Sequence, residues 1–402
     1  MEAHVRQEGL TRTWHRVALL ALGGACLLAG LDGALLNAGF WAPVSSATVE
    51  DAHGLVMVLG FLGTVIALER SVALDRPWAY LAPALLGLGG IAMAVSSLVS
   101  VGRILLLDGC VALVAVYVVL WRRNRDVTVL VQLVGAVCAL CAVLVSFRLA
   151  TADVLGLLVT FVVATIAAER VELARIVLPP GAGRTVAAFV VALMASAAAV
   201  VVAPAVAGRV FGIVLVVGTA WLLAHDVALR TVRATGLPRF SAVGMLLGYA
   251  WLLLAGAAWV AVGRPSPGTG AYDLVVHAVF LGFAMSMVLA HGPIILPALL
   301  RRPLPYRRWL YGPLVLLHLA LVWRLGLGVL ARRAELWAGG AMATVVALLL
   351  VPLTMAAATL LRPSSTRPAG RWRSPASSNS AGTHHPQAAA PTRPDRRKGA
   401  SR

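Results

Sequence analysis

The chain has 402 residues, of which 60% are hydrophobic and only 12% are charged, about half the charged share of an ordinary soluble domain. A water-soluble globular protein is excluded, because no compact fold of this size could bury so much apolar surface. The formal net charge is nevertheless +18. The position of the basic residues therefore decides whether their partner is nucleic acid or a membrane.

Long apolar segments follow one another along most of the chain. A membrane-spanning helix needs about 20 apolar residues, and helices are expected because lipid offers no partner for an unpaired backbone amide. The segments also lack the alternating pattern of a membrane β-barrel. We therefore predict an all-α, polytopic integral membrane protein with twelve transmembrane helices, at about residues 17–40, 53–74, 79–100, 103–121, 127–147, 152–173, 186–206, 208–228, 240–262, 272–297, 309–330 and 335–361.

The basic residues separate into two groups when the connections between these segments are numbered from the N-terminus. The N-terminal segment, the even-numbered connections and the C-terminal tail hold 27 of the 34 basic residues, whereas the odd-numbered connections hold only six. Short cytoplasmic segments of membrane proteins carry an excess of Lys and Arg. Both termini are therefore predicted to be cytoplasmic. The lipid bilayer, and not nucleic acid, is the expected partner of the basic charge.

Three parts of the chain follow from this pattern. Residues 1–16 are predicted to be a cytoplasmic N-terminal segment, and residues 17–361 a twelve-helix transmembrane domain. Residues 362–402 are rich in Pro, Ser, Ala and Arg and are expected to form a disordered, basic cytoplasmic tail. The four cysteines all lie in apolar segments, where cysteine usually acts as a small apolar residue.

Two segments of the chain resemble each other. Residues 53–70 and 153–170 are identical at six of 18 aligned positions, and both end in Glu-Arg. Both segments are predicted to run from outside to inside, so this would be a parallel repeat. Each Glu-Arg sequence is expected at the cytoplasmic end of its helix, where it could form a boundary ion pair.

Five histidines lie within or at the ends of the apolar segments: His53, His225, His277, His291 and His318. An ionisable group inside a membrane is costly, so each is a candidate functional residue. Neutral imidazole is a good ligand for iron and copper, which makes haem or metal binding the first hypothesis. A histidine can also lie among lipid headgroups, which is our preferred interpretation of His225.

The predicted topology assigns a depth to four of these histidines. His53 and His277 both lie at the outer ends of their helices, so they could bind one haem iron between them. His291 follows His277 by 14 residues and returns to nearly the same helix face, close to the inner end. His291 and His318 are candidates for an inner metal site or a proton relay. The alternative for His318 is a core histidine bonded to a neighbouring carbonyl.

One face of the second predicted helix carries His53, Met57, Gly60 and Thr64. Small residues on such a face permit close approach of a flat macrocycle or of another helix. We list Met57 and Gly60 as candidate cofactor-binding residues on this basis. Gly60 alone would equally fit simple helix packing.

Arg324 is the one arginine that we assign to a span and not to a connection, because the other arginines inside the predicted bounds lie within five residues of a span end. A buried guanidinium needs a negatively charged partner. We predict that Arg324 binds a haem propionate, with Asp32 or Asp108 as the alternative partner.

Two short motifs in these helices resemble those of the NnrS family of twelve-helix bacterial membrane proteins. The first, H-x3-M-x2-G-F-x3-V-I-A, begins at His53, and the second, H-A-x3-G-x4-M, begins at His277. The chain departs from the family at Leu55, where a second histidine is usual, and after His291, where the family's G-H-T-G-R is absent. The run from His53 to Met57 also resembles the second helix of haem-copper oxidase subunit I.

The resemblance to NnrS implies a function and a location. NnrS proteins bind haem and copper and are linked to relief of nitric oxide stress. The resemblance therefore implies a haem b group with His53 and His277 as axial ligands, and copper as a further metal. It also implies a role in nitrosative stress or in protecting respiratory metal centres, with a redox partner or respiratory complex, in the bacterial cytoplasmic membrane.

Two other functions fit the same chain. A proton-coupled secondary transporter of a small molecule is compatible with twelve helices, a parallel repeat and intramembrane Asp32 and Asp108. A membrane assembly factor without chemistry of its own is the third interpretation. Whether the protein is an enzyme is left open.

Overall fold

The computed structural model describes residues 2–44, 47–175, 177–200, 202–300 and 304–360. The chain divides into two compact units, Met1–Leu361 and Arg362–Arg402. All of the described residues belong to the first unit, so the predicted disordered tail lies outside them.

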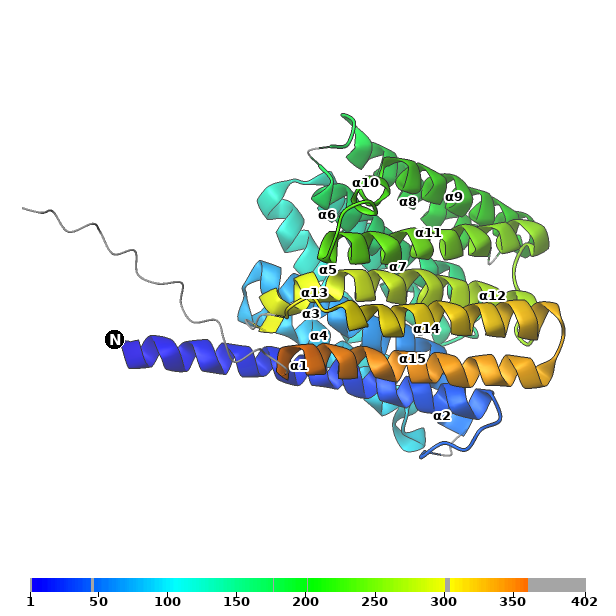
Figure 1. The fold of residues 1–402 in the computed structure, drawn as a ribbon, viewed down its shortest axis with the longest axis horizontal. Coiled ribbons are helices and arrows are strands. Elements are labelled where there is room, and N and C mark those ends of the chain that lie inside the picture. The colour runs from blue at the N-terminus through cyan, green and yellow to red at the C-terminus, as the bar shows by residue number, and fades with distance from the viewer. Residues whose placement is uncertain (1, 45–46, 176, 201, 301–303, 361–402) are drawn as a thin grey trace, which may run out of the picture. The chain divides into compact units, whose positions relative to one another are not determined.

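The regular elements of the described residues are all helical (Figure 1). In chain order they are α1 (Glu2–Asn37), α2 (Ala47–Leu55), η1 (Val56–Gly63), α3 (Thr64–Leu74), η2 (Pro77–Tyr80), α4 (Leu81–Met93), η3 (Ser96–Leu98), α5 (Val99–Asn124), α6 (Val127–Ser146), α7 (Leu155–Leu173), α8 (Ala182–Ala199), α9 (Pro204–His225), α10 (Ala228–Thr231), α11 (Leu237–Val262), α12 (Gly270–His277), η4 (Ala278–Met285), α13 (Ser286–Leu300), η5 (Arg308–Leu310), α14 (Tyr311–Leu321), η6 (Val322–Leu330) and α15 (Ala334–Leu360). The prediction of an all-α fold is confirmed for this part of the chain.

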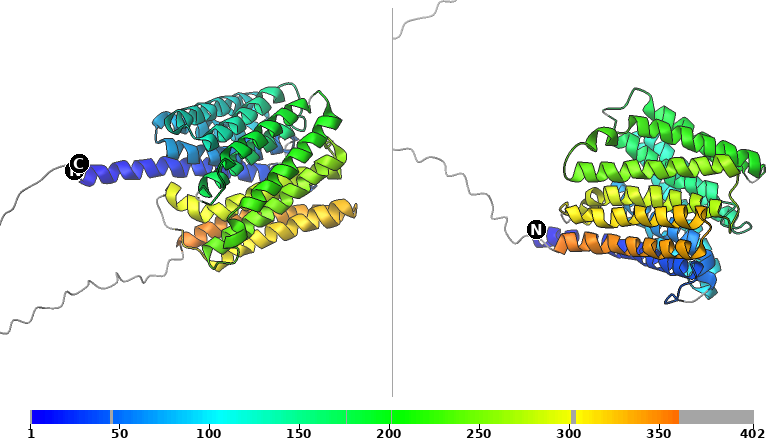
Figure 2. Two further views of the ribbon diagram at one scale, coloured as in Figure 1. Left: turned by 90° about the horizontal axis from the view of Figure 1, so that it is seen from above. Right: turned by 45° about the vertical axis from the view of Figure 1, so that its right-hand side comes forward.

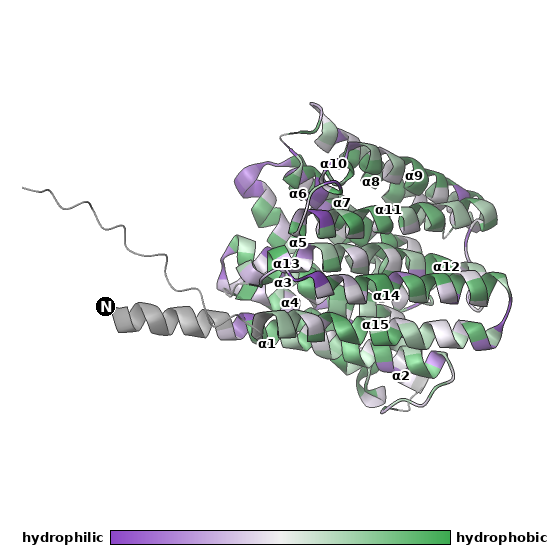
Figure 3. Cartoon of the chain, in the orientation of Figure 1, coloured by the Kyte–Doolittle hydropathy of each residue, from purple (hydrophilic) through white to green (hydrophobic). Residues whose placement is uncertain are grey.

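Ten helical stretches within the described residues are long and apolar enough to cross a membrane. They coincide with ten of the twelve predicted segments. The other two predicted segments also lie on helices. One is the shorter apolar helix Pro77–Met93, and the other is α7, whose last turns carry Glu169, Arg170 and Glu172. The helices are hydrophobic along most of their length, with hydrophilic residues concentrated in connections such as that between α5 and α6 (Figure 3). This is the architecture of a multi-pass membrane protein.

One predicted boundary is displaced. The sequence predicts spans at 79–100 and 103–121, but α4 ends at Met93 and α5 begins at Val99. The chain turns at Ala94 and Val95, directly before the short 3-10 helix η3 (Ser96–Leu98). The helices on both sides of the turn are apolar, so hydrophobicity alone does not reveal the turn.

The helices pack against one another in a bundle, in which the green helices are tilted relative to the blue and teal ones (Figure 2, left). Consecutive long helices form several of the contacts, including α4 with α5, α6 with α7, and α14 with α15. Large apolar side chains are exposed on the outside of the bundle, among them Leu88, Val111, Leu144, Val217 and Leu327. Such exposure suits a lipid environment and would be unfavourable in water.

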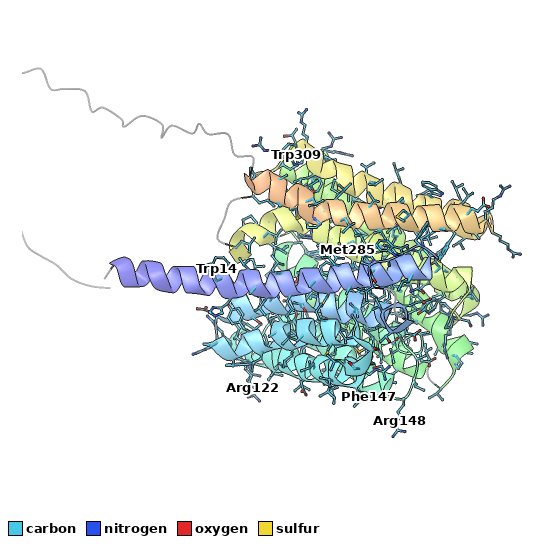
Figure 4. All side chains as sticks on the ribbon, turned by 90° about the horizontal axis from the view of Figure 1, so that it is seen from below. Trp14, Arg122, Phe147, Arg148, Met285 and Trp309 are labelled. Carbon is cyan, nitrogen blue, oxygen red and sulfur yellow. The ribbon has the colours of Figure 1, made fainter. Side chains whose placement is uncertain are left out.

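The two ends of the bundle are marked by labelled side chains in Figure 4. Trp14, Arg122 and Trp309 lie at one end, and Arg148 lies at the other. Arg122 also lines a cleft of about 780 Å³ together with other arginines of the same end, Arg76 and Arg123. Arg122 lies in an even-numbered predicted connection and Arg148 in an odd-numbered one, so their separation agrees with the predicted two-sided distribution of arginines.

Close helix contacts depend on glycine at several crossings, and Gly212 is the clearest case. A Cβ atom on Gly212 of α9 would lie 2.6 Å from the Val260 nitrogen and 2.7 Å from the Gly256 oxygen of α11. These are backbone atoms, so neither helix can yield without moving as a whole. Gly212→Ala is therefore expected to lower the free energy of unfolding by about 1–3 kcal/mol, measured by unfolding in mixed detergent micelles.

Gly24→Ala is the matched control for this substitution. Gly24 also lies inside a long helix, α1, but a Cβ atom there would meet nothing within 4 Å. The free energy of unfolding of Gly24→Ala is expected to stay within about 1 kcal/mol of that of the parent protein. Equal losses in the two variants would show that helix contact is not what Gly212 provides.

Candidate functional site

His53 lies in the last turn of α2 and is held by the neighbouring helix α1. Its Nδ1 atom is 2.7 Å from the carbonyl oxygen of Gly30. A carbonyl can only accept a hydrogen bond, so Nδ1 must carry the ring proton and Nε2 has a free lone pair. Within the described part of the chain, no hydrogen bond to Nε2 occurs.

His277 ends α12 and is held in the same way by its own helix. Its Nδ1 atom lies 2.8 Å from the Asp273 carbonyl oxygen and 3.0 Å from the carboxylate oxygen Oδ1 of Asp273. Nδ1 is again the proton donor, and Nε2 makes no hydrogen bond to any described residue. Metal-binding histidines typically have one ring nitrogen anchored to a carbonyl or carboxylate, which leaves the other for the metal.

The fold brings these two histidines into one region together with Arg324. His53 lies within electrostatic range of both His277 and Arg324. They come from three helices that are distant in sequence, α2, α12 and η6. The cluster of His53, His277, Arg324 and Asp273 is called the histidine cluster below.

Asp273 is the central residue of the histidine cluster, although it was not among the candidate residues predicted from the sequence. Its carboxylate accepts hydrogen bonds from Arg324 Nε at 3.1 Å, Arg324 Nη2 at 2.6 Å and Trp337 Nε1 at 2.9 Å. The guanidinium carbon of Arg324 also lies 4.9 Å from the centre of the Trp337 ring. The signal in the sequence was the spacing of Asp273 and His277, four residues apart, which places them on one helix face.

The alternative partners predicted for Arg324 are therefore wrong. Asp32 instead accepts a hydrogen bond from the backbone nitrogen of Val44 at 3.2 Å, and it closes the turn after α1. Asp108 was expected inside the bundle, but it lies on the exposed face of α5. When a helix is apolar on all sides, its sequence does not reveal which side faces the bundle. The sequence therefore located Asp108 along the helix correctly but assigned it to the wrong side.

Met57 and Gly60 pack against other helices. A Cβ atom on Gly30 of α1 would collide with the Met57 side chain. A Cβ atom on Gly60 would lie 3.0 Å from Gly90 Cα of α4 and 3.2 Å from Cys26 Sγ of α1. Helices α1 and α4 therefore pack against the face that carries these residues. This agrees with the alternative prediction for Gly60, simple helix packing.

Among the residues that the structure describes, three segments are π-helical, and each one adjoins the histidine cluster. The segment η1 begins three residues after His53, η4 begins directly after His277, and η6 contains Arg324. In soluble proteins well under 1% of residues are π-helical. Such segments often occur at functional sites, because they redirect side chains relative to a regular helix.

The two histidines proposed for an inner metal site are engaged elsewhere. His318 accepts a hydrogen bond from Trp251 Nε1 on Nδ1 at 2.8 Å, and its Nε2 lies 3.2 Å from Ser286 Oγ. The Nε2 atom of His291 lies 3.1 Å from Arg170 Nη1. A metal would have to displace one of these partners. Among the described residues, no group of three or more His, Cys, Asp or Glu side chains is arranged around a common metal position.

His225 lies at the end of α9, as expected for an interfacial residue. Its ring stacks on Trp221 with the ring centres 4.6 Å apart, and its Nδ1 atom donates to the Trp221 carbonyl oxygen at 2.8 Å. The ring is exposed.

A buried ionic network lies at the opposite end of the bundle from His53. Arg170 of α7 forms two hydrogen bonds with Asp226, Nε to Oδ2 and Nη2 to Oδ1, both of 3.0 Å. Tyr249 donates to Asp226 Oδ2 at 2.7 Å. Arg170 therefore connects a carboxylate, a phenol and the ring of His291.

The two Glu-Arg sequences of the internal repeat have different partners. Arg70 Nη2 lies 2.6 Å from Glu69 Oε1 and 3.0 Å from Glu169 Oε1. Arg70 thus bridges the two copies of the repeat, whereas Arg170 forms its ion pair with Asp226, which lies outside the repeat. A pairing between the two copies was not expected from the sequence, which suggested a separate ion pair at the end of each helix.

A search of curated proteins finds no relative of the chain. The profile of one protein family, described as a domain of unknown function (DUF8744), matches residues 16–360. This range contains every described residue of the histidine cluster and of the ionic network. Because the match covers most of the chain, this membrane protein belongs to the DUF8744 family.

Proposed function

We propose that this protein binds a haem b group between His53 and His277, which act as its axial ligands. The observation that supports the proposal is that the His53 and His277 rings have the same hydrogen-bonding arrangement. Each is anchored through Nδ1, and each has an Nε2 lone pair without a partner among the described residues. Two neutral imidazoles from separate helices can supply both axial ligands of a haem iron.

The surrounding residues have supporting roles in this proposal. Asp273 fixes the ring orientation of His277 and raises the basicity of its free nitrogen. Arg324 keeps its positive charge next to the site and is our candidate for contact with a propionate, alongside its bond to Asp273. Met57 and Gly60 contribute by positioning the helix that carries His53. When bound, the haem would supply one-electron chemistry and ligand binding at iron.

The proposal extends to topology and biological role. Twelve spans with both termini in the cytoplasm are supported by the distribution of basic residues. A place in the bacterial cytoplasmic membrane, and a role in nitric oxide stress or in protecting respiratory metal centres, are supported by the resemblance of the two histidine motifs. A redox partner or respiratory complex would exchange electrons with the haem. Copper at His291 and His318 is less well supported, because their ring nitrogens are engaged.

The test of this proposal is the visible spectrum of the purified protein. Cells that express the chain with an ample haem supply should yield a protein with a Soret band and the reduced-state bands of a bis-histidine haem. A protein that is folded and monodisperse but colourless would contradict the proposal.

Asp273→Asn is expected to weaken haem binding without abolishing it. The amide keeps the shape of the carboxylate but loses the charge that orients His277 and pairs with Arg324. Loss of such an outer partner typically costs about 10- to 100-fold in affinity. Haem titration of the stripped protein measures the change, and an unchanged affinity would show that Asp273 does not support the ligand.

A proton-coupled secondary transporter is the second candidate. It is favoured by the buried ionic network around Arg170 and Asp226, because ionisable groups inside membrane bundles often carry protons in transporters. A transporter should keep its activity after His53→Ala, whereas a haem protein should lose its cofactor.

A further inference from the structure

The cleft at the end of the bundle that carries Arg122 is lined largely by charged side chains. Its volume of about 780 Å³ lies within the range of ligand sites in proteins. Two helices that pack against each other, α3 and α5, both end at this cleft. Its lining includes Ala73, Asp75 and Arg76 from the end of α3 and the connection after it, and Val119, Arg122 and Arg123 from the end of α5. This site is called the arginine cleft below.

The three arginines of the arginine cleft have no anionic partner in the described part of the chain. The side chains of Arg76, Arg122 and Arg123 are exposed, and none of their guanidiniums forms a hydrogen bond or an ion pair with a described residue. By contrast, Arg70 and Arg170 each bind a carboxylate. The guanidiniums of the cleft are therefore available to an external anion.

The arginine cleft has an excess of positive charge. Asp75 supplies one carboxylate against three guanidiniums, which leaves a net charge of +2 on the lining side chains. The C-terminal ends of α3 and α5 add partial negative charge, but this contribution is weak at an exposed helix end. An anion with two negative charges would therefore balance the cleft.

The outer face of α5 indicates that this anion has an apolar part. Val111, Ala115, Val119 and Arg122 are all exposed, and their spacing of four, four and three residues places them in one stripe along the helix. The stripe is about 16 Å long at 1.5 Å per residue. This is about the depth of one leaflet, since the hydrocarbon core of a bilayer is about 30 Å thick. An acyl chain can therefore lie along α5 while its headgroup reaches the cleft.

Tryptophans place the cleft at the depth of the lipid headgroups. Trp121 directly precedes Arg122 on α5, and Trp78 lies on η2 and is exposed. The exposed Trp14 and Trp309 lie at the same end of the bundle as Arg122 (Figure 4). Tryptophan is enriched where the hydrocarbon core meets water. The phosphate groups of a phospholipid lie at this level.

We propose that the arginine cleft binds a phospholipid with two phosphate groups, of the cardiolipin type. Arg76, Arg122 and Arg123 bind the phosphates, because the fork of N–H donors on a guanidinium matches the oxygens of a phosphate group. One acyl chain lies along the exposed stripe of α5 and contacts Val119. The bound lipid thereby joins the ends of α3 and α5.

The lipid site does not depend on the proposed haem function. His53 lies near the start of the helical stretch Thr48–Leu74, whereas the arginine cleft lies at its end. Failure of haem binding would leave this proposal intact, and the reverse also holds.

The experiment measures binding of an acyl-labelled fluorescent cardiolipin to the full chain in mixed micelles by fluorescence anisotropy. Unlabelled cardiolipin should displace the probe at lower concentration than phosphatidylglycerol, which has one phosphate group. Inorganic phosphate should not displace it when ionic strength is held constant. Equal displacement by the two lipids would overturn the proposal. Displacement by inorganic phosphate would also overturn it and would assign the cleft to a soluble anion.

Two double variants test where the lipid binds. R122Q/R123Q should bind the probe about 25-fold more weakly, at about fivefold for each arginine at an anionic lipid surface. R230Q/R233Q is the matched control, because Arg230 and Arg233 are exposed arginines of the same basic side that lie outside the cleft. It should bind as the parent protein does. Equal losses in the two variants would show that surface charge in general attracts the lipid, and would overturn the proposal.

A73W covers the case in which the loss of two arginines prevents folding. Ala73 is exposed and lines the arginine cleft, so an indole at this position should fill space that the headgroup needs and weaken binding of the probe. No charge changes in this variant. An affinity equal to that of the parent protein would contradict the assignment of the cleft as the binding site.

Discussion

Replacement of His53 or His277 by alanine is expected to remove the haem spectrum of the purified protein completely. Each ring supplies one Nε2 atom to the proposed site. Among the described side chains of the histidine cluster, no other nitrogen is available as a ligand, because the Arg324 guanidinium donates hydrogen bonds to Asp273. With only one of the two histidines left to hold the haem, the cofactor should dissociate during purification. Absorption at the Soret band relative to protein absorption measures the effect.

His225→Ala is the matched control. Its ring is exposed and stacks on Trp221 at the end of α9, so its removal should leave the haem content unchanged. His318→Ala separates the two metal hypotheses. It should also leave the haem in place, although loss of the hydrogen bond from Trp251 should reduce stability. A spectrum that survives in both His53→Ala and His277→Ala would contradict the assignment of the axial ligands.

Asp226→Asn is expected to cause the largest loss of stability among the polar substitutions, about 3–5 kcal/mol. Asp226 and Arg170 are 7% and 8% exposed, and each carboxylate oxygen accepts one hydrogen bond from the guanidinium. Asparagine leaves the buried Arg170 without a counter-charge and weakens the bond from Tyr249. The change in the free energy of unfolding in mixed micelles measures the effect.

The exposed pair of Arg175 and Asp126 is the matched control for this ion pair. It joins the same two residue types, but the Arg175 side chain is 61% exposed. Arg175→Gln is expected to cost less than about 1 kcal/mol, since solvent screens an exposed pair and side-chain ordering opposes it. Similar losses in Asp226→Asn and Arg175→Gln would show that burial does not govern the strength of these pairs.

The contribution of Asp226 should also depend on pH. Burial by itself would raise the pKa of the Asp226 carboxyl group, but the Arg170 guanidinium, the Ala228 N–H and the Tyr249 hydroxyl together hold this pKa below its usual value. A depressed pKa adds stability above the unfolded-state pKa, which is about 4, and this stability is lost as the pH falls through the folded-state pKa. The parent protein should therefore lose more stability than Asp226→Asn on acidification below about pH 4.

The sequence by itself determined the all-helical class and the position of most helices. A bilayer imposes a length and an apolar composition on every helix that crosses it, so both can be recognised without knowing any tertiary contact. The same holds for the two-sided distribution of arginines, such as Arg122 and Arg148. The sequence also selected His53 and His277, because an imidazole in an apolar segment is unusual in itself.

The tertiary structure alone decided which polar groups meet. Arg70 and Arg170 stand in the same local sequence, yet one bridges two glutamates and the other binds Asp226. The difference lies in which helices pack beside each arginine, and a uniformly apolar helix does not reveal its buried face. The exposed position of Asp108 and the pairing of Arg324 with Asp273 have the same origin. Hydrophobicity determines that these helices form a bundle, but close packing at residues such as Gly60 and Gly212 sets their rotation and therefore the polar contacts inside it.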